Sequence, residues 1–192
     1  MIAALFVQKG GVYYGLDDVD PWPEERDARL YAGPWPVVAH PPCQRWINYA
    51  ALNFKRWGGE HNRPGNDGGC FASALASVRK WGGVLEHPAE SKAWPAHGLI
   101  EPWTHGGWKY ADGDWVCEVW QSAYGHLARK RTWLLYHSEN PPPRLDWSQK
   151  PGTHQIGWFD RIKPTLSKRE SNATPIPFRD VLLDIARSAQ RP

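Results

Sequence analysis

The chain of 192 residues lacks the features that would place it across a membrane or outside the cell. No apolar run approaches the roughly 18 residues of a membrane-spanning helix, and the start, MIAALFVQKGG, lacks the basic region and cleavage pattern of a secretory signal. The three cysteines, Cys43, Cys70 and Cys117, are odd in number and far apart, which argues against a disulfide framework. We therefore expect a soluble, cytoplasmic protein with no membrane partner, in which any functional cysteine acts as a thiol.

Glycine, proline and tryptophan are abundant, whereas the net charge is small. The 18 glycines and 18 prolines stay below the range of about 25–30% that marks low-complexity chains, and the 13 tryptophans supply large apolar side chains. The formal net charge of +3 is uneven, because residues 129–192 hold 12 Lys or Arg against 6 Asp or Glu. We expect one loop-rich globule. Its basic C-terminal third favours a polyanionic partner such as DNA, with an ordinary solvated surface as the alternative.

Short apolar runs bounded by turn residues predict β-strands. They lie at residues 3–7, 12–16, 37–40, 84–87, 116–120 and 132–136. Between the third and fourth runs, GGCFASALASVRKWGG places Phe71, Leu75 and Val78 at helical spacing before a glycine stop. Strand, helix and strand form one βαβ unit, so we expect an α/β fold. Its mostly parallel sheet would be flanked by helices and would bind a ligand at the carboxyl ends of its strands.

Two further segments are assigned by composition. Residues 178–189 carry apolar residues at helical spacing and predict a closing helix. Residues 53–67 are polar and Gly-rich, which is typical of a mobile surface loop.

Cys43 follows the predicted strand at 37–40 in a Pro-Pro turn, VVAHPPCQRW, so we expect its thiol to face the crevice. A low thiol pKa requires a positive neighbour or backbone N–H donors, and His40 and Arg45 are near in sequence. A free cysteine that acts as an inert small hydrophobic residue is the alternative. No metal is expected, because His40 and Cys43 have no second pair at ligand spacing and the P-C-x-x-C of zinc deaminases is absent.

Glu86 ends the next predicted strand, so adjacent parallel strands would bring its carboxyl group into one pocket with Cys43. We expect the apolar strand to raise the pKa of Glu86 toward an acid/base range; a carboxylate that caps the following turn is the alternative. Arg129 and Arg131 lie two residues apart, on one face of an extended segment, where two guanidiniums suit a phosphate or a flipped base. Surface arginines before a strand are the alternative there.

Four motifs, in order, resemble those of the DNA cytosine-5 methyltransferases, particularly the small phage-type members. P-C-Q at residues 42–44 is similar to the family's catalytic P-C-Q, and E-H-P at 86–88 to its E-N-V or E-N-P motif. R-K-R at 129–131, within YGHLARKRTWLLY, is similar to its Q-x-R-x-R motif. SNATPIPFRDVLLDIA, at 171–186, resembles the closing G-N-A/S-V-P-x-P motif before the final helix.

The resemblance implies a reduced Rossmann-like, class I methyltransferase-like fold and covalent chemistry on a pyrimidine of DNA. Cys43 would add to C6 of the ring, and Glu86 would engage N3. Arg129 and Arg131 would hold the adduct, which leaves C5 nucleophilic toward a donor. On duplex DNA the base must first leave the stack. The substrate-binding residues that this match implies are His40, Pro42, Gln44, His87, His126 and Asn172.

The cofactor-binding end departs from this family. LFVQKGGVYYGL keeps Phe6, Gly10 and Gly11 of the family's S-adenosylmethionine loop, but Gln8 replaces its first glycine. PWPEERDARLYAGPWP shows no clear second βα unit with an acidic strand end for the ribose, and KGG also fits the turn of a β-hairpin. We therefore expect an N-terminal strand pair or hairpin, and weak or absent S-adenosylmethionine binding.

In these terms residues 1–192 form a single methyltransferase-like domain. An altered cofactor-loop region covers 1–36, a catalytic core 37–137, an irregular insert 138–177 and a closing helix 178–190.

Several functions remain open. The first is a DNA pyrimidine-modifying transferase with Cys43 as nucleophile, which uses S-adenosylmethionine or, as a phage-type hypermodification enzyme on a 5-substituted pyrimidine, another donor. P-P-C also resembles thymidylate synthase, a C5 transferase of free nucleotides, but the other motifs of that family are missing. The last is a noncatalytic nucleic-acid-binding module whose tryptophans stack on bases. That module requires Trp46, Trp57, Trp108 and Trp120 to be accessible.

Overall fold

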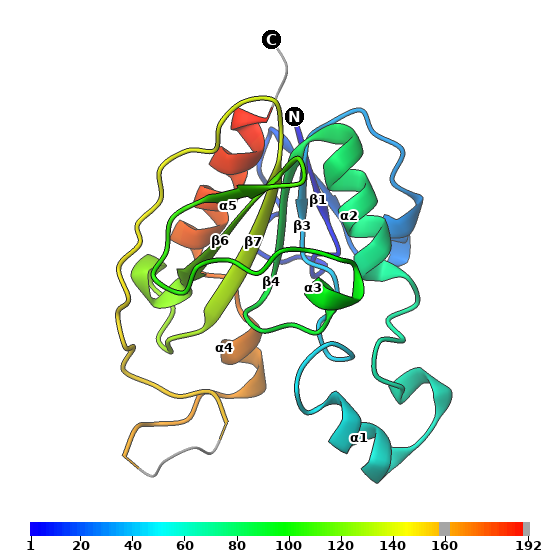
Figure 1. Ribbon diagram of the computed structural model, residues 1–192, viewed down its shortest axis with the longest axis vertical. Helices are drawn as coiled ribbons and strands as arrows, with labels where there is room; N and C mark the ends of the chain where they lie inside the picture. Colours follow the sequence, from blue (N-terminus) through cyan, green and yellow to red (C-terminus); the bar gives the residue numbers. More distant parts are fainter. Residues whose placement is uncertain (158–161, 190–192) are drawn as a thin grey trace.

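A seven-stranded mixed sheet organises the computed structural model, which describes residues 1–157 and 162–189 (Figure 1). The strand order is β2-β1-β3-β4-β7-β6-β5. The strands are β1 (Ile2–Leu5), β2 (Val19–Trp22), β3 (Val37–Ala39), β4 (Gly83–Pro88), β5 (Lys109–Ala111), β6 (Asp114–Trp120) and β7 (Arg131–His137). β2, β1, β3 and β4 pair in parallel, whereas β7 is antiparallel to β4 and β6, and β5 is antiparallel to β6. The predicted α/β class is confirmed, and within this sheet only β7 and β5 run against the other strands.

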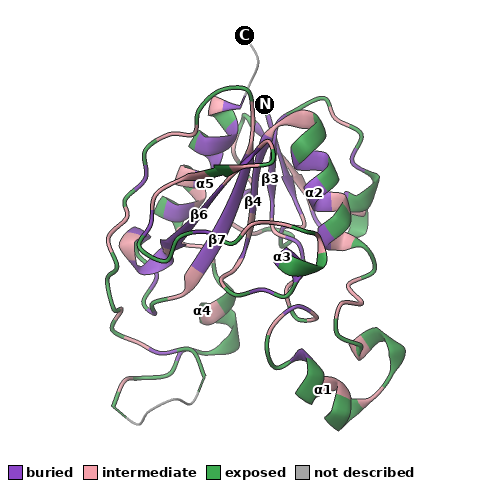
Figure 2. Cartoon of the chain, viewed as in Figure 1, coloured by how far each residue is buried: buried purple, intermediate pink, exposed green. Residues whose placement is uncertain are grey.

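Helices α2 (Cys70–Trp81) and α5 (Ile176–Ser188) cover opposite faces of the sheet (Figures 1 and 2). Phe71 and Val78 of α2 pack into the core on one face, and Leu182 and Ile185 of α5 pack into the core on the other. Alternate residues of each central strand enter these two cores, as the period of two in a strand requires. Both helices were predicted from their apolar spacing.

The N-terminal strand pair exists, but it is parallel, so the predicted hairpin with a strand at residues 12–16 is wrong. Residues 9–15 form turns instead: the Gly11 N–H donates to the Gln8 carbonyl (3.0 Å) and the Tyr14 N–H to the Gly11 carbonyl (3.0 Å). The chain then enters β2 in the direction of β1. The sequence VDPW concealed β2, because a proline lacks the backbone N–H and is tolerated only in an edge strand such as this one.

Residues 53–67, expected as a loop, contain most of a helix, α1 (Ala50–Trp57), and the short 3-10 helix η3 (Glu60–Asn62). AALNFKRW is rich in residues that favour helices, and Gly58 ends the helix with φ +59°. α1 extends away from the sheet, and most of its residues are exposed (Figure 2).

Residues 138–177, predicted to be irregular, contain one short helix, α4 (Lys168–Asn172), within their described part. A capping box holds its start: Ser167 Oγ accepts from the Glu170 N–H (3.2 Å), and the Glu170 carboxylate accepts from the Ser167 N–H (2.9 Å). The predicted closing helix begins slightly earlier than expected, at Ile176, and residue 190 lies outside the described residues. The other short helical segments are η1 (Glu24–Arg26), η2 (Ala28–Leu30), α3 (Ala93–Ala96) and η4 (Gln121–Tyr124).

In the described part of the chain, no helix is both long enough and apolar enough to span a membrane.

Candidate active site

The predicted crevice corresponds to the carboxyl edge of β1, β3 and β4. From β1 the chain passes to β2 on one side, while β3 lies on the other side of β1, so the strand order reverses between β1 and β3. In open α/β sheets ligands bind outside the carboxyl ends of the strands at such a switch point. The segments that leave β1 and β3 meet here, where Tyr13 Oη lies 2.7 Å from His40 Nε2.

Cys43 is half-buried in the loop that leaves β3 at this edge. The loop turns back at once, since the Trp46 N–H donates to the Cys43 carbonyl (2.8 Å). The Trp46 indole N–H in turn donates to Asp67 Oδ2 (2.8 Å), which also accepts from the Phe71 N–H in the first turn of α2 (2.8 Å). The backbone that carries the thiol is therefore tied to the core helix.

His40 and Glu86 face each other across β3 and β4. The parallel register pairs Val38 with Val84, so the residues two positions further along each chain point to the same side of the sheet. His40 Nδ1 lies 3.0 Å from Glu86 Oε2, and 15% and 13% of the two side chains stay exposed. The carboxylate is therefore held in place and is still reachable from solvent.

A second side chain reaches the other oxygen of Glu86. Gln121, the first residue after β6, donates through Nε2 to Glu86 Oε1 (3.2 Å) and to Thr132 Oγ1 (2.9 Å). The Thr132 hydroxyl donates to the Lys130 carbonyl (3.3 Å). With the contact between Tyr13 and His40, these bonds connect the turn after β1 to the start of β7.

Lys130, which was not among the predicted site residues, is the cation beside Glu86 and Cys43. Its ammonium interacts electrostatically with both groups, and its Nζ donates to the carbonyl of Ala173, just after α4 (3.4 Å). Burial lowers the pKa of Lys130, while Glu86 and Cys43 act in the opposite direction. Its φ of +28° breaks the alternation of side chains that an extended segment at 129–131 would have.

The surrounding charges move the two candidate reactive groups in opposite directions. Burial alone would raise the pKa of Glu86, but the hydrogen bond and charge of His40 and the charge of Lys130 outweigh it and lower that pKa. The expectation of a raised Glu86 pKa is therefore wrong. Burial, followed by the Glu86 carboxylate, raises the pKa of the Cys43 thiol, against the influence of Lys130. A carboxylate thus lies beside a protonated thiol at neutral pH.

The thiol gives a first prediction. Glu86→Gln removes a negative charge and lowers the pKa of Cys43, whereas Lys130→Met removes a positive charge and raises it. At slightly alkaline pH the first change speeds alkylation of Cys43 by iodoacetamide severalfold, and the second slows it. Peptide mass spectrometry across a pH series measures the rate at Cys43, with Cys70 as the internal reference. Equal rates in both variants would contradict the electrostatic coupling.

Arg131, predicted to hold a substrate adduct, is occupied within the protein. Its Nε lies 2.8 Å from Glu118 Oε1 and its Nη2 lies 2.9 Å from Glu118 Oε2, while Nη1 contacts Glu90 (2.6 Å). Arg129 is exposed, with its guanidinium 5.1 Å from the centre of the Trp120 ring. The described contacts therefore link neither guanidinium to Cys43, and Lys130 takes the place expected for them.

His87 points to the other side of β4 from Glu86, because successive residues of a strand face opposite sides. It is fully buried, with ring centres 5.1 Å from Phe71 and 6.3 Å from Trp94. Burial lowers its pKa to about 4, so the ring is neutral near pH 7. The expectation that His87 binds substrate is corrected by this orientation, which makes it a core residue behind the site.

The other predicted substrate-binding residues differ in their exposure to solvent. Pro42 and Gln44 are exposed in the Cys43 loop. Asn172 is exposed at the end of α4, next in sequence to the residue whose carbonyl accepts from Lys130. His126 is buried, and burial lowers its pKa.

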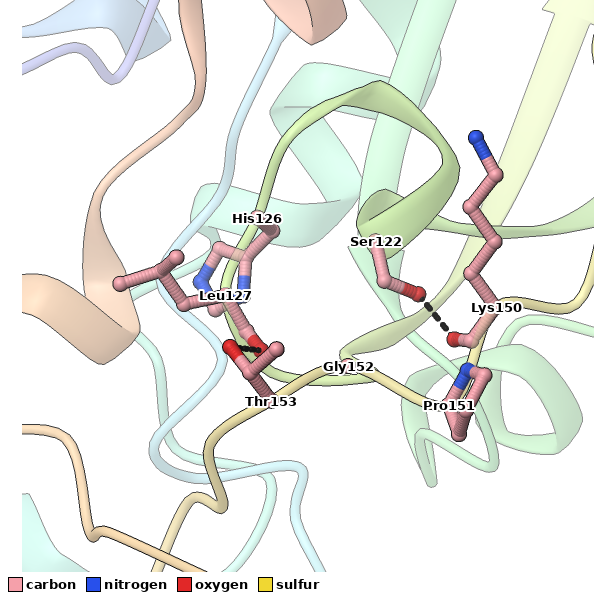
Figure 3. Close-up of a pocket in the computed structure, with 7 residues that line it drawn as sticks. All are labelled: Ser122, His126, Leu127, Lys150, Pro151, Gly152 and Thr153. Atoms are coloured by element: carbon pink, nitrogen blue, oxygen red, sulfur yellow. Dashed lines mark hydrogen bonds between the residues drawn. The ribbon is translucent and has the colours of Figure 1, made fainter.

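A surface cavity of about 340 Å³ lies beside this region (Figure 3). Its lining residues are Ser122, His126, Leu127, Lys150, Pro151, Gly152 and Thr153. The Ser122 hydroxyl donates to the Lys150 carbonyl (2.5 Å), and the Thr153 hydroxyl donates to the Leu127 carbonyl (3.5 Å). The cavity shares His126 with the predicted site but includes neither Cys43 nor Glu86.

The predicted cofactor residues are explained by the turns after β1. Phe6 has φ +59° and packs against the α2-side core, and Gly10 has φ +65°. A Cβ at Gly11 would lie 2.9 Å from the Gln8 carbonyl oxygen, so the turn itself requires glycine there. Within the described chain no helix follows β1 before β2, so the loop lacks a helix N-terminus to face a bound cofactor.

β2 pairs with β1 in parallel, at the start of the segment in which the sequence shows no clear second βα unit. Glu24 and Glu25 follow its end, where an acidic side chain could meet a ribose, but Glu25 pairs with Lys9 of the preceding loop (3.0 Å). The chain after β2 forms the 3-10 helices η1 and η2 in place of a packed α-helix. In the described chain, therefore, no α-helix begins between β1 and β3, and Glu25 is already paired.

Tyr13, Gln121 and Lys130 complete the site without having been predicted. Gln121 had a detectable signal, because a polar residue directly after β6 lies at the same edge as Glu86 when β6 and β4 share a direction. Tyr13 was hidden in a segment interpreted as a strand. Lys130 was missed because an extended segment would place its side chain on the opposite face from Arg129 and Arg131.

The described ranges contain no group of three or more His, Cys, Asp or Glu residues that could hold a metal ion. Comparison of the chain with protein-family models, with curated proteins and with solved structures finds no match.

Proposed function

We propose that this protein is an enzyme that modifies pyrimidines in DNA, with Cys43 as the nucleophile. The observation that carries the proposal is the cluster of a thiol, a carboxylate and an ammonium group at the switch point of the sheet, formed by Cys43, Glu86 and Lys130. Addition to an electron-poor double bond needs a nucleophile, a group that orients the ring and a cation that stabilises the developing charge. The cluster contains all three.

In the proposed reaction the Cys43 thiol loses its proton to solvent, and the thiolate adds to C6 of the ring. The electron pair of the C5=C6 bond moves toward the ring substituent at C4, which makes C5 nucleophilic. Lys130 stabilises the negative charge, and Glu86 orients the ring through N3. C5 then takes a proton from water or an electrophile from a donor. Loss of the hydrogen originally on C5 and of the thiolate restores the double bond.

The fold supports the reduced Rossmann-like, methyltransferase-like interpretation. Most strands of the sheet share one direction and helices cover both of its faces, which is the arrangement that the methyltransferase resemblance implies. The closing motif before α5 lies beside the site, since the Ala173 carbonyl accepts from Lys130.

DNA is proposed as the partner because exposed basic residues flank this edge of the sheet. Lys55 and Arg56 lie on α1, and Lys168 and Arg169 lie on α4, on either side of the carboxyl ends of the strands (Figure 1). Such positive charge favours binding to phosphates.

The alternative of a noncatalytic module with stacked tryptophans receives less support. Trp46 is 8% exposed and its indole N–H is bound to Asp67, and Trp108 and Trp120 are half-buried. Among the four tryptophans considered for stacking, only Trp57, on α1, is largely exposed, at 69%. One ring does not make the row of platforms that such binding uses.

The loop after β1 leads to a prediction about the donor. Because its glycines serve the turn and Lys9 pairs with Glu25, we expect calorimetric titration to show no S-adenosylmethionine binding tighter than about 100 μM. A dissociation constant in the low micromolar range would restore an ordinary methyltransferase. The same observation favours the second candidate, a hypermodification enzyme that keeps the Cys43 pocket and does not use this donor.

A donor-free assay tests the proposed function. Addition and elimination at Cys43 exchange the hydrogen on C5 with solvent, whatever group the complete reaction transfers. DNA that contains deoxyuridine as well as deoxycytidine, both of which carry a hydrogen on C5, is incubated with the protein in D₂O, digested and analysed as nucleosides by mass spectrometry. We expect deuterium at pyrimidine C5, at a rate that rises with pH, because the thiolate is the attacking species. DNA that gains no deuterium above a protein-free control would contradict the proposal.

A further inference from the structure

We propose that the target base is a 4-oxo pyrimidine, of the uracil or thymine type, and that Glu86 and Lys130 select it over cytosine. This inference rests on the proposed function and names the substrate class of the same site. It departs from the cytosine target that the methyltransferase resemblance implies. The argument depends on which partner donates in each hydrogen bond around Glu86.

The orientation of the Gln121 amide follows from its neighbour. The Thr132 hydroxyl has a single proton, which it donates to the Lys130 carbonyl (3.3 Å). Its oxygen must therefore accept from Gln121 (2.9 Å). The NH₂ group of Gln121 therefore faces Thr132, and it also donates to Glu86 Oε1 (3.2 Å). One oxygen of Glu86 is thus an acceptor.

The second oxygen is fixed by His40. His40 Nδ1 lies 3.0 Å from Glu86 Oε2, and His40 Nε2 lies 2.7 Å from Tyr13 Oη. Beside an ionised Glu86, Nδ1 carries the proton of this hydrogen bond and donates it to Oε2. Both oxygens then accept, which is the hydrogen-bonding state of a carboxylate. The nearby Lys130 ammonium favours the same ionised state, and the lowered pKa of Glu86 agrees with it.

A carboxylate and an ammonium group distinguish pyrimidines by the hydrogen-bond donors and acceptors at N3 and C4. Uracil and thymine present an N3–H donor to the carboxylate of Glu86 and an O4 acceptor to the ammonium of Lys130. Cytosine presents the reverse pattern, a lone pair at N3 and an amino group at C4. It would therefore bring acceptor against acceptor and donor against donor, so that neither the carboxylate nor the ammonium group would gain a hydrogen bond from the base.

The chemistry points the same way. When the Cys43 thiolate adds to C6 of a uracil ring, the electron pair of C5=C6 moves through C4 onto O4 and forms an enolate, and the positive charge of Lys130 stabilises this oxygen. C5 takes a deuteron from D₂O. Removal of the original C5 proton by solvent and expulsion of the thiolate restore the ring, with no oxidant, reductant or further reactant consumed.

Two single-stranded oligonucleotides that differ only in one base, deoxyuridine or deoxycytidine, provide the test. The rate of deuterium uptake at C5 is measured for each with the wild-type protein and divided by the rate with free cysteine at the same pH, which removes the difference in intrinsic reactivity. We expect the normalised rate to be at least about tenfold higher for deoxyuridine. An equal or higher rate for deoxycytidine overturns the inference and leaves the proposed function standing, whereas no uptake in either overturns the proposed function itself.

Glu86→Gln gives a matched second measurement. An amide in place of the carboxylate donates to N3 of cytosine as well as it accepts from N3–H of uracil, so the ratio of the two rates falls toward one. Loss of folding or of general positioning would slow both bases equally and keep the ratio. A ratio unchanged in this variant, or in Lys130→Met, would contradict selection by these two groups.

Discussion

Cys43→Ser removes the exchange of the C5 hydrogen, with an expected loss of about 10³-fold or more relative to the wild-type protein. The serine hydroxyl keeps the size and place of the thiol but, with a far higher pKa, supplies almost no attacking anion in a site that already disfavours a second negative charge. The measurement is deuterium uptake on DNA under the conditions of the donor-free assay.

Cys70→Ser is the matched control. Cys70 is a free, half-buried thiol at the start of α2, and burial also raises its pKa, but it lies far from Glu86 in sequence and contacts neither it nor Lys130 in the described interactions. We expect this variant to keep most of the exchange. A Cys43→Ser protein that exchanges hydrogen at the wild-type rate would exclude Cys43 as the nucleophile.

Arg131→Ala is expected to lower the free energy of unfolding by about 3 kcal/mol, because it leaves Glu118 buried without its charge partner. Only 1% of the Glu118 side chain is exposed, and its carboxylate also accepts from the indole N–H groups of Trp120 and Trp133. Arg129→Ala, at an exposed position, should change stability by no more than about 0.5 kcal/mol. Urea denaturation of the two variants compares them directly.

Neutralising Glu118 separates charge from packing. In the Arg131→Ala background, Glu118→Gln keeps an oxygen acceptor for one of the two indoles and removes the unpaired charge, so part of the lost stability returns. Equal stability of the Arg129 and Arg131 variants would contradict the structural role of Arg131 and restore the prediction that it holds the substrate.

The central elements were predictable because their apolar patterns are strong. β3, β4, β6 and β7 are short buried runs with clear turns around them, and α2 shows helical spacing before two glycines. β2 was not predictable, because Pro21 breaks the sequence pattern of a strand and is acceptable only at the edge of the sheet. α1 was missed because it carries little apolar signal and packs against little of the protein.

The site was predictable to the extent that it depends on topology. Cys43, in the loop after β3, and Glu86, within the adjacent parallel strand β4, come to one edge of the sheet, as expected from the βαβ unit. The hydrogen bonds around His40 and Glu86 were not predictable, because Tyr13, which contacts His40, lies in a turn, and Gln121, which donates to Glu86, follows a distant strand. The kink at Lys130 reverses which side chain of R-K-R faces the site, and no pattern in the sequence marks it.

Covalent trapping tests the central claim most directly. A DNA oligonucleotide that carries 5-fluoro-2′-deoxyuridine is incubated with the wild-type protein, the mixture is denatured to stop reversal, and the intact mass and the proteolytic peptides are measured. If Cys43 adds to C6 and C5 takes a proton from water, the complex has the summed mass of protein and oligonucleotide, and the modified peptide carries the nucleotide on Cys43. Absence of a complex, or a bond that maps to Cys70 or Cys117, would contradict the claim.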